Sequence, residues 1–216
     1  MVKVKICGIT SFEDADKACE YGADFLGFIF VKGTPRCIDP FEASDIIQKL
    51  KERFDHVGMV GLFKDEDIVK VREVVSSCNL DHVQLHGGEL PGYCRELKAV
   101  TGVKIIKAFK VDGDILSHGS HRISDYADAD YFVFDTYHPL VAGGTGVQFD
   151  WDALSGLNDD IRGRSFVAGG LAPDNVAEAV RTVKPYGVDV SSGVEESPGK
   201  KDDKLLKEFI ENAKKV

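Results

Sequence analysis

Two apolar runs near the end of the chain finish in small residues whose backbone could bind an anion. Residues 166–171 read FVAGGL, and residues 187–195 read GVDVSSGVE. Strands that end in glycine and serine expose backbone N–H groups with no bulky side chain in the way, as a phosphate group requires. Either run alone favours an ordinary tight turn. Together they predict a phosphate site on Gly169, Gly170, Ser191, Ser192 and Gly193.

Two other strand ends carry groups that could move protons. Cys7 ends the alternating segment VKVKIC, and the alternation places Lys5 on the same face, roughly 7 Å away along the strand. A cation there would favour the thiolate, which is a base, although a free cysteine is more often a small buried residue. Asp135 ends FVFD, where apolar surroundings favour the protonated form that a general acid needs. The alternative for Asp135 is a loop or capping aspartate.

Three further residues and one loop are candidates for the same site. Arg36 follows a proline in the loop after the second strand, and its planar fork suits a carboxylate, unless it is a surface arginine. His86 shares a face with Gln84 and could bind substrate, orient another group, or simply be packed. Lys107 could form a Schiff base, but a structural lysine inside the barrel is favoured. The loop at 142–146, AGGTG, is expected to be mobile, and a lid is one role for it.

The composition excludes several classes of protein. The chain has 216 residues, of which 43% are hydrophobic, and a net charge of −9, so nucleic acid and anionic membrane are not expected partners. The first residues lack a signal-peptide core, and no apolar run is long enough to span a bilayer. Five cysteines without CxxC spacing are typical of a reduced, cytoplasmic enzyme. A monomer or homodimer is expected.

The elements that must position these residues repeat along the chain. Apolar strands are predicted at 1–6, 23–30, 57–63, 82–85, 103–109, 131–134, 166–168 and 188–190. Apolar stripes at helical spacing run through 12–19, 43–50, 68–75, 90–97, 176–180 and 205–210, and a short helix is predicted at 151–157. Thr10 and Glu13 predict a capping box for the first helix, and the helix after the fifth strand is weak and polar.

Eight strand–helix units without a linker predict a single closed (β/α)8 TIM barrel over residues 1–216. The alternative is an open, doubly wound sheet, but no GxGxxG follows the first strand, which disfavours a dinucleotide fold. In such barrels the chemistry lies at the C-terminal ends of the strands, where all of the candidate residues are found.

Nearly the whole chain resembles the phosphoribosylanthranilate isomerase family of tryptophan biosynthesis. The motifs are, in order, KICGIT, DFLGFIF, TPR, VQLHGGE, IKAF, FDT with GGTG and FDW, AGGLAPDNV, and DVSSGVEESPGKKD. The resemblance implies an Amadori rearrangement that needs no cofactor and no metal. It also implies that Cys7 is the general base, Asp135 the general acid and Arg36 a substrate-positioning arginine. The chain departs from the family pattern at Cys37, where an aromatic residue is common, and at Lys64 and Asp65, where many members have Val-Asn.

Four other functions are weighed against this one. A metal-dependent sugar-phosphate epimerase would need more histidines and aspartates at the strand ends. A Schiff-base aldolase would use Lys107 and could be trapped with borohydride. A non-catalytic phosphate-binding barrel is disfavoured by the pairing of Cys7 with Asp135. A relaxed isomerase that also takes the aminoaldose of histidine synthesis would be expected to use two aspartates, so Cys7 favours a single substrate.

Overall fold

The computed structural model describes residues 1–111, 117–118, 121–135, 151–154 and 156–216. The loop predicted at 142–146 lies outside the described residues.

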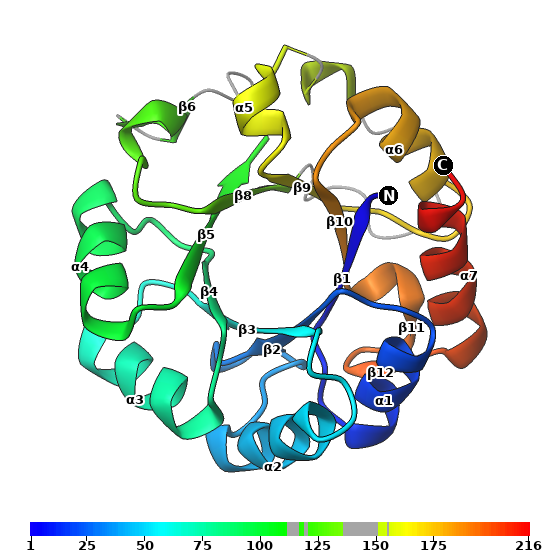
Figure 1. The fold of residues 1–216 in the computed structure, drawn as a ribbon, viewed down its shortest axis with the longest axis horizontal. Helices are drawn as coiled ribbons and strands as arrows, with labels where there is room; N and C mark the ends of the chain where they lie inside the picture. Colours follow the sequence, from blue (N-terminus) through cyan, green and yellow to red (C-terminus); the bar gives the residue numbers. More distant parts are fainter. Residues whose placement is uncertain (112–116, 119–120, 136–150, 155) are drawn as a thin grey trace.

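Eight parallel strands close into a barrel, as predicted (Figure 1). The barrel strands are β1 (Lys3–Cys7), β2 (Phe25–Ile29), β3 (Gly58–Phe63), β4 (His82–Leu85), β5 (Lys104–Lys110), β8 (Tyr131–Asp135), β9 (Ser165–Ala168) and β10 (Gly187–Val190). Strand β10 closes the barrel against β1, with Lys5 paired to Asp189 in register. Every predicted strand is present, with ends that differ by at most two residues.

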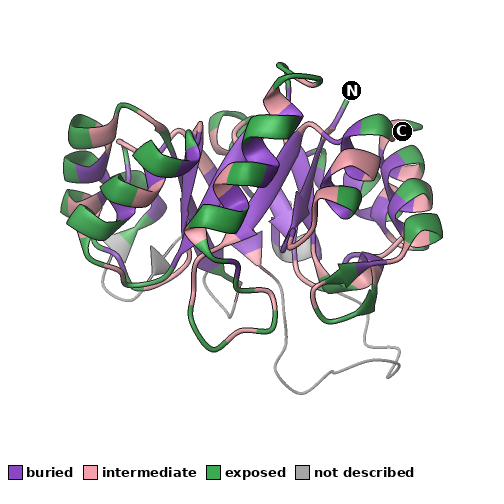
Figure 2. Ribbon diagram, turned by 90° about the horizontal axis from the view of Figure 1, so that it is seen from below, coloured by how far each residue is buried: buried purple, intermediate pink, exposed green. Residues whose placement is uncertain are grey.

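Helices surround the barrel and bury their apolar stripes against it (Figure 2). They are α1 (Phe12–Glu20), α2 (Pro40–Lys51), α3 (Ile68–Cys78), α4 (Pro91–Thr101), α5 (Asp159–Arg162), α6 (Val176–Val183) and α7 (Asp203–Lys214). None of the described helices is long and apolar enough to cross a membrane.

The fifth and sixth units differ from the regular pattern. After β5, the described residues hold a small pair of strands, β6 (Ser117–His118) and β7 (His121–Arg122), and the 3-10 turn η1 (Ile123–Asp125) in place of a helix. The predicted helix at 151–157 is a 3-10 turn, η2 (Trp151–Leu154), and α5 follows it. A polar sequence offers no apolar stripe to bury, so the fifth unit does not form a full helix among the described residues.

The start of α1 corrects one prediction. Ser11, not Thr10, is the N-cap, because its side chain accepts the backbone N–H of Asp14. Thr10 donates its hydroxyl to the carbonyl oxygen of Gly199 instead. Gly199 belongs to a hairpin that the sequence did not predict, formed by β11 (Glu195–Ser197) and β12 (Lys200–Lys201), which follows the 3-10 turn η3 (Ser192–Val194). The hairpin lies beside α1 in Figure 1.

Aromatic rings fill the interior of the barrel. Phe25 and Phe166 meet edge to face, with ring centroids 5.4 Å apart. Gly58 and Gly187 make room for them, because a Cβ atom at these positions would lie 2.7 Å from Phe25 and 2.5 Å from Phe166. The interior is therefore a packed core, and the open space lies at the C-terminal ends of the strands.

Candidate active site

A cavity of about 320 Å³ lies at the C-terminal ends of the barrel strands. Every residue predicted for the site lines it: Cys7, Arg36, His86, Asp135, Gly169, Gly170, Ser191, Ser192 and Gly193. These residues come from six separate segments of the sequence, and closure of the barrel brings them together.

The loops after β9 and β10 form the small-residue end of the cavity. Gly170 has a positive φ of 62°, and its carbonyl oxygen accepts a hydrogen bond from Asn175. The backbone N–H groups of Gly170, Ser192 and Gly193 find no acceptor among the described residues. A Cβ atom on Gly193 would lie 1.9 Å from the carbonyl oxygen of Leu171, so the two loops touch. This close approach brings the N–H groups of both loops to the same end of the cavity.

Cys7 lies at the end of β1 and is 5% exposed. Its sulfur occupies the space left by Gly27, where a Cβ atom would lie 2.9 Å from Sγ. Lys5 points to the same interior, fully buried, and its Nζ donates to Oδ2 of Asp189 at 2.7 Å. Both Lys5 and Cys7 therefore face inward, as the alternation predicts.

Lys5 favours the thiolate of Cys7, as the sequence predicts, but it is not the strongest influence on this thiol. Burial raises the pKa of the Cys7 thiol, and the positive charge of Lys5 only partly offsets this. The negative charge of Asp189 also raises the pKa of Cys7, because it compensates the lysine. Burial alone would lower the pKa of Lys5, but Asp189 outweighs it and keeps the ammonium charged. Cys7 therefore lies beside a buried ion pair, and its pKa is raised overall.

Asp135 ends β8, which lies across the cavity from Cys7. Its Oδ2 lies 3.6 Å from Nε2 of His86. The other ring nitrogen of His86 lies 3.1 Å from Nε2 of Gln84. His86 is thus held between an amide and a carboxylate, which orients its ring toward Asp135.

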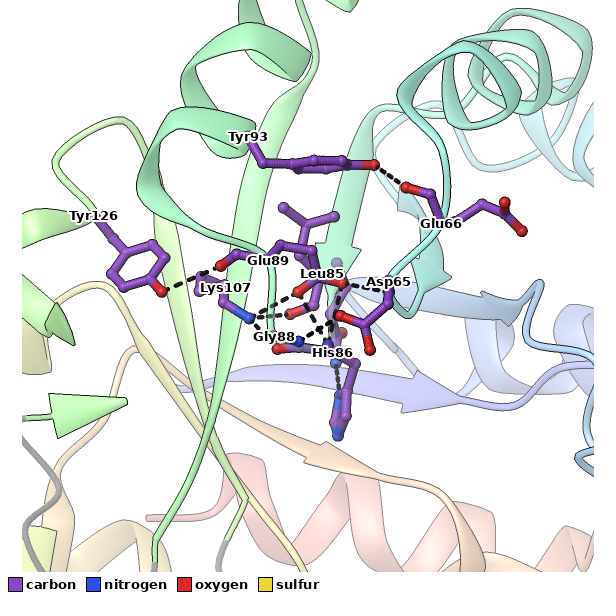
Figure 3. A network of polar contacts seen from close by, with 11 residues as sticks. Asp65, Glu66, Leu85, His86, Gly88, Glu89, Tyr93, Lys107 and Tyr126 are labelled. Carbon is purple, nitrogen blue, oxygen red and sulfur yellow. Dashed lines mark hydrogen bonds and ion pairs between the residues drawn. The ribbon is translucent and has the colours of Figure 1, made fainter. Parts of the chain in front are cut away.

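Lys107 is a structural lysine, as favoured from the sequence. Its buried Nζ donates to the carbonyl oxygens of Gly87 at 2.7 Å and Leu85 at 3.4 Å, and to Glu89 Oε2 at 2.9 Å. Glu89 in turn accepts the N–H groups of Asp65 and Gly87. Figure 3 shows this network beneath the loop that follows β4. It fixes the loop that carries His86, and Lys107 does not line the cavity.

Arg36 reaches inward and lines the cavity, but its guanidinium group is already hydrogen-bonded to the carboxylate of Glu195. Its Nε donates to Oε1 of Glu195 at 2.8 Å and its Nη2 to Oε2 at 2.6 Å. The aliphatic stem crosses Gly8, where a Cβ atom would lie 2.8 Å from Cδ of Arg36. The hydrogen bonds to Glu195 raise the pKa of Arg36, so its charge is permanent. Nothing in the sequence pattern indicated Glu195 as its partner.

Several residues of the cavity were missed or left unassigned from the sequence. Asp189 lines it, with a buried Oδ1 that has no partner in the described part of the chain. Lys64 also lines it, whereas Asp65 adopts a left-handed backbone and accepts the N–H of Gly88 at 2.6 Å. Cys37 is exposed and lies outside the cavity. Among the described residues, no group of three or more His, Cys, Asp or Glu side chains could hold a metal ion.

Comparison with known proteins agrees with this geometry. The family model for N-(5'-phosphoribosyl)anthranilate (PRA) isomerase matches residues 4–212. The N-(5'-phosphoribosyl)anthranilate isomerase of Geobacter sp. strain M21 is 46% identical over 216 residues, which is all of both chains. The crystal structure of phosphoribosyl anthranilate isomerase from Thermotoga maritima superimposes with a TM-score of 0.84 at 39% identity, covering all of both chains.

A second solved structure adds a ligand. It is a phosphoribosyl anthranilate isomerase in complex with reduced 1-(o-carboxyphenylamino)-1-deoxyribulose 5-phosphate, 37% identical over all of both chains, with a TM-score of 0.81. The chain described here belongs to the phosphoribosylanthranilate isomerase family.

Proposed function

We propose that this chain catalyses the Amadori rearrangement of N-(5-phosphoribosyl)anthranilate to 1-(2-carboxyphenylamino)-1-deoxyribulose 5-phosphate, the third step of tryptophan synthesis from chorismate. One observation carries the proposal beside the family membership. A thiol and a carboxyl group, Cys7 and Asp135, face one cavity whose end is built from two loops of exposed N–H groups. This arrangement supports an aldose–ketose isomerase that works by general acid–base catalysis.

The first step opens the ribose ring. Asp135, as the acid, protonates the furanose oxygen, and the C1′–O bond breaks while the anthranilate nitrogen supplies its electron pair. The product is an open-chain iminium ion with a free C4′ hydroxyl group. His86, 3.6 Å from Asp135, is placed to orient the carboxyl group for this transfer.

The second step removes the C2′ proton. The iminium ion withdraws electrons from C2′, and its positive charge beside Cys7 favours the thiolate over the thiol. Cys7 takes the C2′ proton, and the electron pair of the C–H bond neutralises the iminium to give an enolamine. The enolamine takes up a proton at C1′ and loses the proton of its C2′ hydroxyl group, and the ketone results.

The two ends of the cavity suit the two ends of the substrate. The loops after β9 and β10 would hold the phosphate group through the N–H groups of Gly169, Gly170, Ser192 and Gly193. The opposite wall carries Ile29, Val31 and Leu62, which offer apolar surface for the anthranilate ring. Arg36 and Lys64 flank that wall and suit the ring carboxylate.

The test is the fall in fluorescence of phosphoribosylanthranilate when purified protein is added. Turnover supports the proposal, and its absence with a folded protein favours a non-catalytic phosphate-binding barrel. Borohydride trapping of substrate on Lys107 would favour an aldolase instead. The aminoaldose of histidine synthesis should not be turned over.

The remaining expectations concern the protein in the cell. We treat residues 1–216 as one barrel domain that acts as a monomer or homodimer. All five cysteines are free thiols, which supports a reducing compartment, and we place the enzyme in the cytoplasm.

A further inference from the structure

The hairpin formed by β11 and β12 holds an ion network from which the proposed function uses only Arg36. Glu195 and Lys201 are paired across the hairpin, with Lys201 Nζ 3.0 Å from Glu195 Oε1. Their side chains are only 4% and 1% exposed, although both residues belong to a short surface hairpin. Arg36 completes the network from the other side of Glu195. We refer to Arg36, Glu195 and Lys201 as the Glu195 network.

Glu195 fixes the direction of the Arg36 guanidinium group. The bidentate contact takes up one edge of the fork, Nε and Nη2, and leaves Nη1 without a partner in the described part of the chain. Arg36 keeps 23% of its side chain exposed, on the wall of the cavity. A guanidinium held along one edge loses little further conformational freedom when it binds a second anion.

Lys201 links Cys7, the proposed base, to the loop after β10 that is proposed to bind the phosphate group. Its Nζ donates to the carbonyl oxygen of Cys7 at 2.6 Å and to that of Ser191 at 3.2 Å. The Cys7 carbonyl group ends β1, and the Ser191 carbonyl group follows β10. One ammonium group therefore links the strand that carries the thiol to the loop after β10. The hairpin is itself anchored, because the N–H of Lys201 donates to Asp14 and Thr10 donates to Gly199.

The network reinforces the charges of Glu195 and Arg36. Burial opposes ionisation of Glu195, but the hydrogen bonds from Arg36 and the charge of Lys201 outweigh it, so the pKa of this carboxyl group lies below its ordinary value. Burial lowers the pKa of the Lys201 ammonium group, and the ion pair with Glu195 only partly offsets this. The negative member of the network lies directly behind the arginine that faces the proposed carboxylate site.

We propose that Glu195 and Lys201 are positioning residues for substrate binding and catalysis in this barrel. Glu195 orients the guanidinium group of Arg36 toward the cavity. Lys201 holds the carbonyl groups of Cys7 and Ser191 close together by donating a hydrogen bond to each. The inference rests on the proposed function, because it assigns these residues a part in that same site.

The substitution Glu195→Gln separates positioning from charge. A purely electrostatic role predicts tighter binding of the anionic substrate, because the change removes a negative charge near it. A positioning role predicts weaker binding, because the amide offers Arg36 one acceptor where the carboxylate offers two. We expect KM to rise about tenfold, with kcat changed less than about threefold. The matched control is Glu196→Gln, the next residue, which forms a half-exposed pair with Lys200.

A double-mutant cycle tests whether Glu195 acts through Arg36. In an Arg36→Lys background the fork is already lost, so Glu195→Gln should change KM less than about twofold further. Inhibition by anthranilate should weaken in Glu195→Gln, while inhibition by inorganic phosphate stays at the parent value. For the second half of the proposal, Lys201→Met should lower kcat about tenfold, and the control Lys200→Met should not.

The outcomes are distinguishable. If the wild-type protein shows no turnover, the proposed function is refuted. The role of Glu195 is then tested by measuring how the protein binds anthranilate and inorganic phosphate. If the wild type is active, an unchanged or lower KM in Glu195→Gln overturns the role of Glu195. The same holds if Glu195→Gln changes KM equally in the parent and in the Arg36→Lys background. An unchanged kcat in Lys201→Met overturns the role of Lys201. If a single variant does not fold, the double variant Glu195→Gln/Lys201→Met, which leaves no unpaired buried charge in the hairpin, must still show the raised KM.

Discussion

Replacing Gly193 by alanine should separate the two loops that form the proposed phosphate site. The new Cβ atom would lie 1.9 Å from the carbonyl oxygen of Leu171, 2.9 Å from its carbonyl carbon and 3.3 Å from Cα of Ala172. All three atoms belong to the backbone of the loop after β9. No side chain can rotate away to relieve this contact, so the backbone itself must move.

The size of the effect follows from that displacement. A Cβ atom is essentially never found closer than 3.0 Å to such an atom, so the loops must separate by at least about 1 Å. A movement of that size breaks at least one hydrogen bond from a loop to the phosphate group. Each hydrogen bond to a charged group contributes about 1.5–3 kcal/mol, so KM should rise roughly 10- to 100-fold. The thiol and the acid lie on other strands, and kcat should fall less.

The assay is steady-state fluorescence turnover together with inhibition by inorganic phosphate. The matched control is Gly92→Ala, because Gly92 lies in the first turn of α4 and nothing lies within 4 Å of a Cβ atom there. That variant should keep the parent KM and gain slightly in stability. A Gly193→Ala variant with the parent values of KM and phosphate inhibition would show that the loops do not bind the phosphate group.

Three further predictions follow from buried charges and from the donor set of the cavity. In a Cys37→Ser background, alkylation of Cys7 by iodoacetamide should be slow at pH 7 and accelerate about tenfold per pH unit, because burial raises the pKa of Cys7. Adding Lys5→Met should slow alkylation further at each pH. Equal alkylation rates with and without Lys5 would contradict the charge effect assigned to this lysine. Lys107→Met leaves Glu89 buried and unpaired, so urea denaturation should show a loss of about 3–5 kcal/mol, and a loss below about 1 kcal/mol would mean that the pair is not buried in solution. Exhaustive treatment with EDTA should leave the rate unchanged, and a loss restored by a divalent ion would favour the epimerase.

The barrel could be predicted because its signals are local. Each strand is a short apolar run, each regular helix has an apolar stripe, and the order of the units leaves few topologies. The alternation of Lys3, Lys5 and Cys7 also gave the correct inward face for Lys5 and Cys7. The helix of the fifth unit was the exception, because the polar segment after β5 carries no apolar stripe.

The site was predicted as a set of residues but not as a set of contacts. Strand ends identify Cys7 and Asp135, since position in a barrel follows from sequence order. The pairing of Lys5 with Asp189, which weakens the effect of the lysine on the thiol, depends on the register between the first and last strands. The bond between Arg36 and Glu195 joins residues 159 positions apart, and no periodic pattern encodes it.

The central claim is that Cys7 removes the C2′ proton and Asp135 protonates the ring oxygen. The most direct measurement is single-turnover fluorescence decay with Cys7→Ala and Asp135→Asn, with Cys94→Ala as the control because that cysteine is buried outside the cavity. Cys7→Ala and Asp135→Asn should each bind phosphoribosylanthranilate and convert it at least about a hundredfold more slowly, while Cys94→Ala stays near the parent rate. If Cys7→Ala keeps most of its activity, the base is another residue, and His86 is the next candidate.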